Sequence, residues 1–128
     1  MTGQVVHFEV PYDDGDRARA FYGEVFGWQI QPVPEFEYNF VQTGPSADTG
    51  MPAEPGYIGG GMFQRDAAVD KPIITIDVDD IEAALAAVAE HGGATVREPE
   101  KVGEMGIAAY FTDSEGNLMG LWQSVGGG

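Results

Sequence analysis

The two halves of this chain repeat one another at an offset of 66 residues. The apolar run that contains His7 aligns with the run that begins at Ile73, and Gly27 aligns with Gly93. In each half, a short apolar strand leads through an acidic turn into an amphipathic helix, and a glycine ends the helix before another strand. Such a repeat predicts two copies of one small module, with a ligand site where the copies meet.

The length and composition of the chain set the broad class of the protein. With 128 residues, 43% of them apolar, we expect one compact domain over 1–128, with modules at about 4–64 and 72–124. The absence of cysteine excludes disulfides, thiolate chemistry and cysteine-ligated metal sites. No apolar run is long enough for a membrane span and the first residues do not resemble a signal peptide, so we expect a cytoplasmic location.

The charge balance is strongly acidic. The chain carries 6 Lys and Arg against 21 Asp and Glu, a formal net charge of −15. Such a field repels phosphate backbones and anionic lipids, which argues against nucleic-acid and membrane partners and favours cationic ligands. Because the acids are scattered rather than clustered, solubility or adaptation to a salty cytoplasm is the simpler explanation.

Hydrophobic periodicity predicts the same order of elements in both modules. Apolar residues at helical spacing predict a first helix that packs its apolar stripe on a sheet and ends at Gly27. The members of this stripe are Ala18, Phe21, Tyr22, Val25 and Phe26. A second helix is predicted to begin after Asp79 and to end at Gly92-Gly93. Strands are predicted over 5–10, 28–33, 36–42, 57–64, 73–78, 94–98, 107–112 and 118–123.

Three segments have unusual local composition. Residues 43–56 are rich in glycine, proline and small polar residues, which predicts a lid, a binding loop or an interface element. Residues 65–71 form the predicted linker between the modules. The glycines at 59–61 lie inside a predicted strand, where they indicate a bulge or a close approach to the backbone rather than a phosphate-binding loop.

Acidic residues gather where the two helices are predicted to begin. Asp13, Asp14 and Asp16 precede the first helix, and Asp79 and Asp80 precede the second. Carboxylates at these positions accept hydrogen bonds from the first backbone N–H groups and interact favourably with the helix dipole. We therefore interpret these clusters as helix caps rather than metal ligands.

Three motifs in a fixed order carry a family resemblance. They are His7 followed by FYGEVFGW, the segment IDVDDIEAALAAVAEHGGATV, and the turn 113–117 (DSEGN) before the last strand. Over residues 4–124 the chain resembles the vicinal oxygen chelate superfamily, which includes glyoxalase I, bleomycin resistance proteins and extradiol dioxygenases. The resemblance implies an α+β fold in which two βαβββ modules pair into a half-barrel around a cavity.

The resemblance also implies where a metal would bind. Metal-dependent members use four ligands, usually His, Glu or Gln, His and Glu, and by position these fall on His7, near Gly60, on Ile73 and on Gly120. Only His7 can coordinate, and one imidazole does not hold a divalent ion firmly. The other histidine, His91, is predicted at the carboxyl end of the second helix in a structural role. We therefore expect no metal and no cofactor, and we assign no catalytic residue.

Side chains predicted to face the cavity define a candidate ligand site. His7 and Glu9 form either an acid/base or hydrogen-bonding pair, in which Glu9 raises the pKa of the imidazole, or the remnant of a ligand position. The aromatic and methionine side chains suit a planar apolar ligand and equally suit an ordinary core. The predicted ligand-binding residues are His7, Glu9, Tyr38, Phe40, Met62, Thr75 and Trp122, with Phe36, Asp77 and Tyr110 as further candidates.

These observations leave three functions open. The first is metal-independent binding or sequestration of a small hydrophobic or aromatic molecule, either neutral or cationic. The second is a metal-dependent lyase or oxygenase of the glyoxalase or dioxygenase type, with His7 as one ligand. The third is a protein-interaction role without small-molecule chemistry. By resemblance we also expect a homodimer, with the cavity formed within one chain or across exchanged modules.

Overall fold

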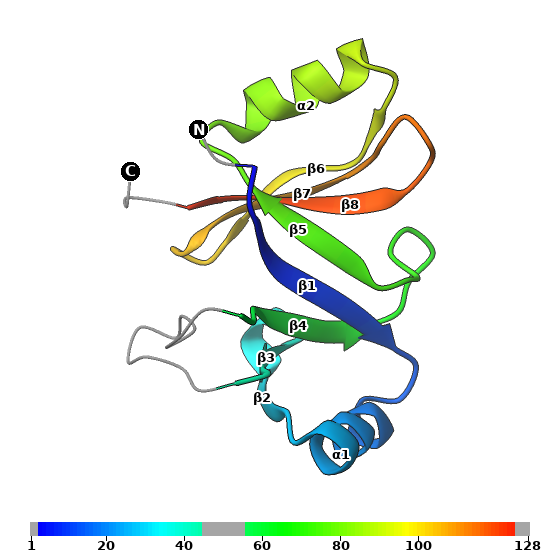
Figure 1. The fold of residues 1–128 in the computed structure, drawn as a ribbon, viewed down its shortest axis with the longest axis vertical. Coiled ribbons are helices and arrows are strands. Elements are labelled where there is room, and N and C mark those ends of the chain that lie inside the picture. The colour runs from blue at the N-terminus through cyan, green and yellow to red at the C-terminus, as the bar shows by residue number, and fades with distance from the viewer. Residues whose placement is uncertain (1–2, 45–55, 125–128) are drawn as a thin grey trace. The chain divides into compact units, whose positions relative to one another are not determined.

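The computed structural model describes residues 3–44 and 56–124, which divide into two compact units. The first unit is His7–Pro72, and the second is Met1–Val6 together with Ile73–Gly128. Each unit holds one α-helix and four neighbouring strands (Figure 1). The predicted loop at 43–56 lies almost wholly outside the described residues.

The first unit has the order strand, helix and three strands. Its elements are β1 (Val5–Tyr12), which belongs to this unit from His7 onward, α1 (Gly15–Phe26), β2 (Gln29–Val33), β3 (Tyr38–Gln42) and β4 (Gly59–Gln64). The strands lie in the order β2-β3-β4-β1. β1 runs parallel to β4, whereas the β3–β4 and β2–β3 pairs are antiparallel.

The second unit repeats this topology. Its elements are β5 (Ile73–Asp77), α2 (Ile81–Glu90), β6 (Ala94–Val102), β7 (Gly106–Thr112) and β8 (Leu118–Ser124). The strands lie in the order β5-β8-β7-β6, again with one parallel pair, β5–β8, and two antiparallel pairs. The prediction of an α+β fold built from two βαβββ modules is therefore confirmed.

Two predicted strands have different bounds. Phe36 lies in a short 3₁₀ turn, η1 (Pro34–Phe36), and Glu37 follows with a φ of 52°, so the third strand begins only at Tyr38. The left-handed backbone at Glu37 reverses the chain and removes Phe36 from the strand's alternation. β6 instead continues to Val102, past Pro99, because register shifts accommodate the extra residues as bulges at the edge of the sheet.

Both helices begin on an aspartate, as predicted. The side chain of Asp14 accepts a hydrogen bond from the backbone N–H of Arg17 at 3.1 Å, and Asp80 accepts one from Ala83 at the same distance. Each bond satisfies a donor that has no partner inside the helix. Gly27 ends α1 with a φ of 74°, a conformation that a side chain would strain.

The core of the second unit lies between α2 and one face of its sheet. Figure 1 shows α2 lying across β6, β7 and β8. The buried residues of this core are Ile81, Leu85, Ala109, Phe111 and Leu121. Since α2 places its apolar stripe against the sheet, the unit is held together in the usual way for an amphipathic helix.

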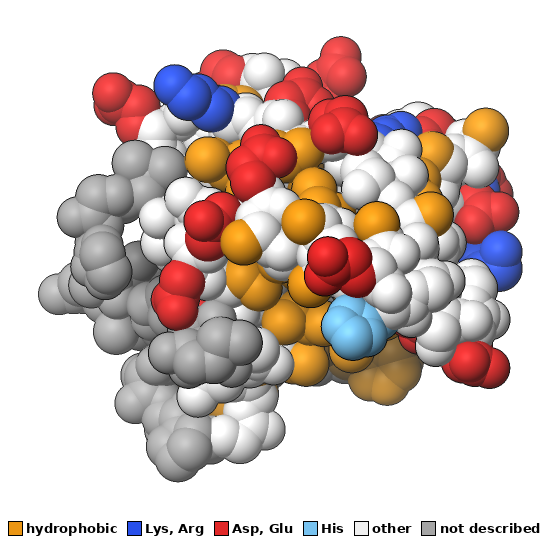
Figure 2. Space-filling model, turned by 90° about the horizontal axis from the view of Figure 1, so that it is seen from above, with side chains coloured by type: hydrophobic (Ala, Val, Ile, Leu, Met, Phe, Trp, Pro, Cys, Tyr) orange, Lys and Arg blue, Asp and Glu red, His pale blue; other side chains and the backbone are white. Residues whose placement is uncertain are grey.

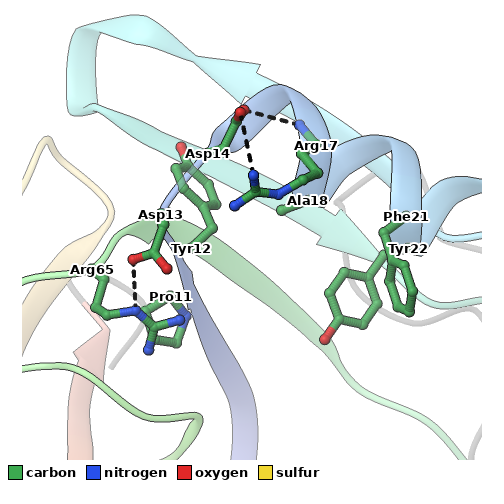
Figure 3. Close-up of a pocket in the computed structure, with 9 residues that line it drawn as sticks. All are labelled: Pro11, Tyr12, Asp13, Asp14, Arg17, Ala18, Phe21, Tyr22 and Arg65. Carbon is green, nitrogen blue, oxygen red and sulfur yellow. Dashed lines mark hydrogen bonds and ion pairs between the residues drawn. The ribbon is translucent and has the colours of Figure 1, made fainter.

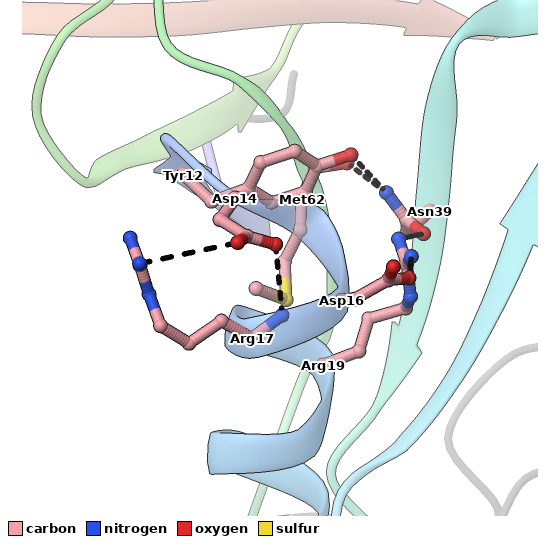
Figure 4. A network of polar contacts seen from close by, with 7 residues as sticks. All are labelled: Tyr12, Asp14, Asp16, Arg17, Arg19, Asn39 and Met62. Atoms are coloured by element: carbon pink, nitrogen blue, oxygen red, sulfur yellow. Dashed lines mark hydrogen bonds and ion pairs between the residues drawn. The ribbon is translucent and has the colours of Figure 1, made fainter.

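The first unit joins its helix to its sheet with polar contacts instead. The side chain of Asn39, only 2% exposed, accepts a hydrogen bond from Arg19 at 3.0 Å (Figure 4). Its amide N–H groups donate to the Tyr12 hydroxyl at 2.9 Å and to the backbone carbonyl of Met62 at 3.0 Å. One buried amide thus connects α1, β1, β3 and β4.

The predicted linker is anchored rather than loose. The carboxylate of Asp66 accepts hydrogen bonds from the backbone N–H groups of Ala68 and Val69. Arg65 donates its backbone N–H to the Tyr12 carbonyl at 2.7 Å, and Val69 is fully buried. These contacts give residues 65–71 a defined conformation.

Replacing Asn39 by alanine should destabilise the fold by about 1–3 kcal/mol, because the buried Met62 carbonyl and Tyr12 hydroxyl lose a partner. Urea unfolding at neutral pH measures this change. The control is Gln31→Ala on the exposed side of β2, expected to stay within about 0.5 kcal/mol of wild type. Equal effects of the two substitutions would contradict a structural role for the Asn39 network.

Candidate functional site

A hydrogen-bonded chain of three side chains marks one face of the first unit. The hydroxyl of Tyr38 donates to a carboxylate oxygen of Glu9 at 2.6 Å and lies 2.8 Å from Nε2 of His7. His7 and Glu9 share this face because they are two residues apart on β1, and Tyr38 of β3 reaches them across Gly61 of the intervening strand β4. The predicted pairing of His7 with Glu9 is therefore mediated by Tyr38.

With Glu9 as a carboxylate, which can only accept, the direction of these bonds gives the tautomer of the imidazole. A phenol has one hydrogen to donate, and Tyr38 donates it to Glu9, so Nε2 of His7 must carry a hydrogen and donate to the phenol oxygen. Burial lowers the pKa of His7 from 6.5 to about 4, because the charged form loses its hydration. The prediction that Glu9 raises this pKa is wrong: loss of water outweighs a carboxylate reached only through Tyr38.

Aromatic rings surround the Tyr38 hydroxyl on this face. The ring of Tyr38 packs against Phe40 at a centroid distance of 5.6 Å and stacks on Phe63 at 6.1 Å. The register agrees, because Phe40 lies opposite Gly61, which in turn lies opposite Glu9. Three rings, a buried carboxylate and a neutral imidazole therefore share one surface, which we call the Tyr38 face.

Met62 does not belong to this surface, so its predicted ligand-facing position is wrong. It lies opposite Val10 and Asn39, on the other side of the sheet, and its side chain is fully buried there. Side chains alternate along a strand, so the ligand-facing residue of β4 is its neighbour Phe63. The glycines at 59–61 have no side chains and hid this alternation in the sequence.

The repeat itself could have identified Phe63. Thr75, the repeat counterpart of Glu9, lies opposite Gly120, just as Glu9 lies opposite Gly61. Aligning the modules on their last strands places Phe63 on Trp122, which faces the same side as Thr75. The offset differs between the first and last strands because the loops differ in length.

In the second unit, the predicted residues occupy the face opposite α2. Thr75, Trp122 and Tyr110 share it, since Thr75 and Tyr110 both lie opposite Gly120 and Trp122 lies opposite Asp77. The Trp122 indole donates to the Ser124 hydroxyl at 3.2 Å, and the guanidinium of Arg97 lies 5.9 Å from the centre of the Tyr110 ring. These positions agree with the predicted orientation, and their role in binding remains a hypothesis.

The residues at the four metal positions of the superfamily do not form a metal site. His7 is the one potential ligand among them, and its Nε2 is engaged with Tyr38. Gly61, next to the predicted position near Gly60, lies on the face of His7 and Glu9. A side chain at Gly61 would begin 1.7 Å from the Tyr38 hydroxyl, and one at Gly120 would begin 2.8 Å from the Thr75 hydroxyl. Hydroxyl groups therefore occupy the space of two ligands, and no cluster of three His, Asp or Glu side chains occurs in the described part of the chain. This donor set does not fit a divalent ion.

A surface pocket of about 280 Å³ lies where β1 meets α1 (Figure 3). Two ion pairs border it: Arg65 to Asp13 at 3.0 Å and Arg17 to Asp14 at 3.9 Å. The remaining acid of this cluster, Asp16, pairs with Arg19. The acids that precede α1 are thus helix-capping or ion-pairing groups, in line with their predicted structural role.

The DSEGN motif forms a self-contained turn. The carboxylate of Asp113 accepts hydrogen bonds from the backbone N–H groups of Glu115 and Asn117 and from the Asn117 side chain. These donors lower the pKa of Asp113 because they favour the charged form. The motif has a structural role before β8.

Acidic side chains are spread over the surface rather than gathered at one place. In the view of Figure 2 they outnumber the basic ones and are separated by apolar and uncharged groups. Within the described residues, neither α1 nor α2 has the length and apolar composition of a membrane-spanning helix.

Comparisons with known proteins agree with the fold. The family model described as bleomycin resistance protein-like N-terminal matches residues 4–44. A protein of Vibrio parahaemolyticus named "Probable lactoylglutathione lyase" is 31% identical over 129 residues, which cover 96% of this chain and 92% of that one.

Two solved structures share this fold at low sequence identity. A Streptomyces coelicolor methylmalonyl-CoA epimerase in complex with 2-nitronate-propionyl-CoA has a TM-score of 0.65 and 16% identity, over 98% of this chain and 97% of that one. A glyoxalase/bleomycin resistance protein/dioxygenase superfamily member from Vibrio splendidus 12B01 has a TM-score of 0.59 and 17% identity, over 98% and 100%.

Acid should destabilise the protein through His7. Unfolding restores the pKa of His7 to near 6.5. Below that pH the imidazole is therefore protonated in the unfolded chain, whereas in the folded protein it stays neutral down to about pH 4. The free energy of unfolding is therefore unaffected by protonation of His7 above pH 6.5. It falls by up to about 3 kcal/mol as the pH is lowered from 6.5 to 4. Urea unfolding at several pH values should show a shallower loss in His7→Gln. The exposed His91→Gln is the matched control and should keep the wild-type slope.

A double-mutant cycle tests the contact between Gly61 and Tyr38. Gly61→Ala should destabilise the wild type by more than about 2 kcal/mol, since the new methyl group collides with the phenol. In a Tyr38→Ala background the same substitution should cost far less. An identical cost of Gly61→Ala in both backgrounds, measured by urea unfolding, would show that the two side chains do not compete for this space.

Proposed function

We propose that this chain, which belongs to the glyoxalase/bleomycin resistance protein/dioxygenase superfamily, binds a small aromatic or apolar molecule without a metal ion. The observation that carries this proposal is the Tyr38 face. The Tyr38 hydroxyl fills the space that a metal-ligating side chain at position 61 would need. The aromatic rings of Phe40 and Phe63 pack against the ring of Tyr38.

The surface chemistry favours a flat ligand with one polar group. Phe40 and Phe63 offer ring surfaces on both sides of Tyr38, and aromatic contacts prefer stacked or edge-on rings. Glu9 is 7% exposed, and its carboxylate can accept a hydrogen bond from an N–H or O–H of the ligand. A cationic ligand gains further from the formal charge of −15, which raises the local concentration of cations.

A second candidate is a metal-dependent lyase or oxygenase with His7 as one ligand. What favours it is the relative at 31% identity that is named a probable lactoylglutathione lyase. It requires that His7 exchange its contact with Tyr38 for a metal and that further ligands come from outside the four family positions. The donor set at those positions argues against it.

Thermal unfolding of EDTA-treated protein with a panel of aromatic compounds tests the proposal. Indole, naphthalene, quinoline and their amine derivatives sample neutral and cationic rings. A ligand present at 100 times its dissociation constant stabilises the folded state by about 2.7 kcal/mol, which is readily measured.

Phe63→Ala should weaken the binding of any such ligand about tenfold or more, because a large ring contact is lost. Phe36→Ala is the matched control, since Phe36 is 45% exposed on the turn before β3 and should leave affinity unchanged. Equal losses for the two variants would place binding elsewhere.

Metal content separates the two candidates. The dialysed protein, after exposure to zinc, nickel, manganese or ferrous iron, should retain less than about one tenth of an ion per chain, as expected for a single imidazole donor. Stoichiometric metal in the wild type that is lost in His7→Ala would overturn metal-independent binding in favour of the enzyme.

A further inference from the structure

The prediction that the first helix packs its apolar stripe on the sheet is wrong for much of the stripe, because α1 leaves three of its large apolar side chains in solvent. Phe21, Val25 and Phe26 are 52%, 57% and 61% exposed, and α1 buries none of its own residues. A helix on the surface of a domain normally turns its apolar stripe towards the core, as α2 does. A contiguous exposed apolar patch of this kind is typical of an interaction surface.

Contacts on the inner side of α1 explain this orientation. Arg19 reaches inward to the amide of Asn39, and Tyr22 stacks on Trp28 at 4.7 Å. Arg19 lies on the opposite side of the helix from Phe21, since successive residues turn by about 100°, and Tyr22 lies between these two sides. The sheet therefore holds α1 by one side and leaves the other uncovered.

Two opposite charges flank the exposed face. Arg17, Phe21, Glu24 and Val25 are spaced i, i+4, i+7 and i+8, so they lie on one side of the helix. The Arg17 side chain is 73% exposed, and Glu24 is exposed as well. The charges stand one turn before and about one turn after Phe21, roughly 10 Å apart along the axis.

We propose that this face pairs with the same face of a second copy of the chain, with the two α1 helices antiparallel about a twofold axis near Phe21. In that orientation Arg17 of each copy lies beside Glu24 of its partner, and the apolar side chains meet at the centre. A parallel pairing would place like charges together. The charge pattern is therefore complementary to itself in one orientation only.

The pocket beside α1 adds to this complementarity. Ala18, Phe21 and Tyr22 line part of its wall, and its volume of about 280 Å³ accommodates an apolar side chain (Figure 3). Antiparallel pairing brings the carboxyl-terminal end of the partner's helix, which bears Val25 and Phe26, to the level of Arg17 and Ala18. Apolar burial would supply affinity, whereas the exposed ion pairs would set the register. None of the side chains of the Tyr38 face takes part.

Sedimentation velocity over a range of protein concentrations tests this interface. It is run in 0.2 M salt, so that repulsion between two acidic chains is screened. Wild type should be a dimer at tens of micromolar, and Phe21→Ser should weaken association at least tenfold. Phe36→Ser replaces another exposed phenylalanine and should leave it unchanged.

Charge reversal tests the antiparallel register. Arg17→Glu and Glu24→Arg should each weaken the dimer severalfold, because each places like charges together. The double variant Arg17→Glu/Glu24→Arg should restore it, since the pairs are then exchanged. Circular dichroism confirms that each variant is folded. A monomeric wild type, a dimer insensitive to Phe21→Ser, or a double variant that is weaker than both single ones would overturn the proposal.

Discussion

The position of the Tyr38 hydroxyl depends on the absence of a side chain at Gly61. A methyl group at that position would begin 1.7 Å from the phenol oxygen, so glycine on β4 is what allows Tyr38 of β3 to reach His7 and Glu9 on β1. The phenol in turn supplies a hydrogen bond to a carboxylate that is mostly buried, which such a group requires. This contact links side chains from β1 and β3 over β4. It also places the neutral imidazole and the aromatic rings on one surface, the Tyr38 face.

The two modules share a topology but use different interactions to hold their helices. α2 covers an apolar core, whereas α1 is tied to its sheet by Arg19 and the buried amide of Asn39. An amide with three hydrogen bonds, together with the Tyr22–Trp28 stack, secures a helix that has no fully buried side chain. Consequently α1 keeps phenylalanine and valine exposed, whereas α2 buries Ile81 and Leu85.

The order of elements could be predicted because hydrophobic periodicity and capping residues are local signals. Asp14 and Gly27 act where the sequence places them, and the cap of α2 lies on Asp80, one residue after the predicted Asp79. The identity of the ligand-facing residue on β4 could not be predicted so easily. Three glycines removed the alternation that separates Met62 from Phe63, and only pairing with β1 and β3 settles which one shares a face with Glu9.

The sequence by itself determined the duplicated βαβββ topology, the capped helices and the scarcity of metal-ligating side chains, because these depend on residue type and spacing along the chain. Only the tertiary structure decided that Tyr38 stands between His7 and Glu9, that burial holds the imidazole neutral, and that α1 turns its aromatic side outward. Each of these depends on which residues from distant strands meet and on how much water they exclude, and no local pattern in the chain encodes either quantity.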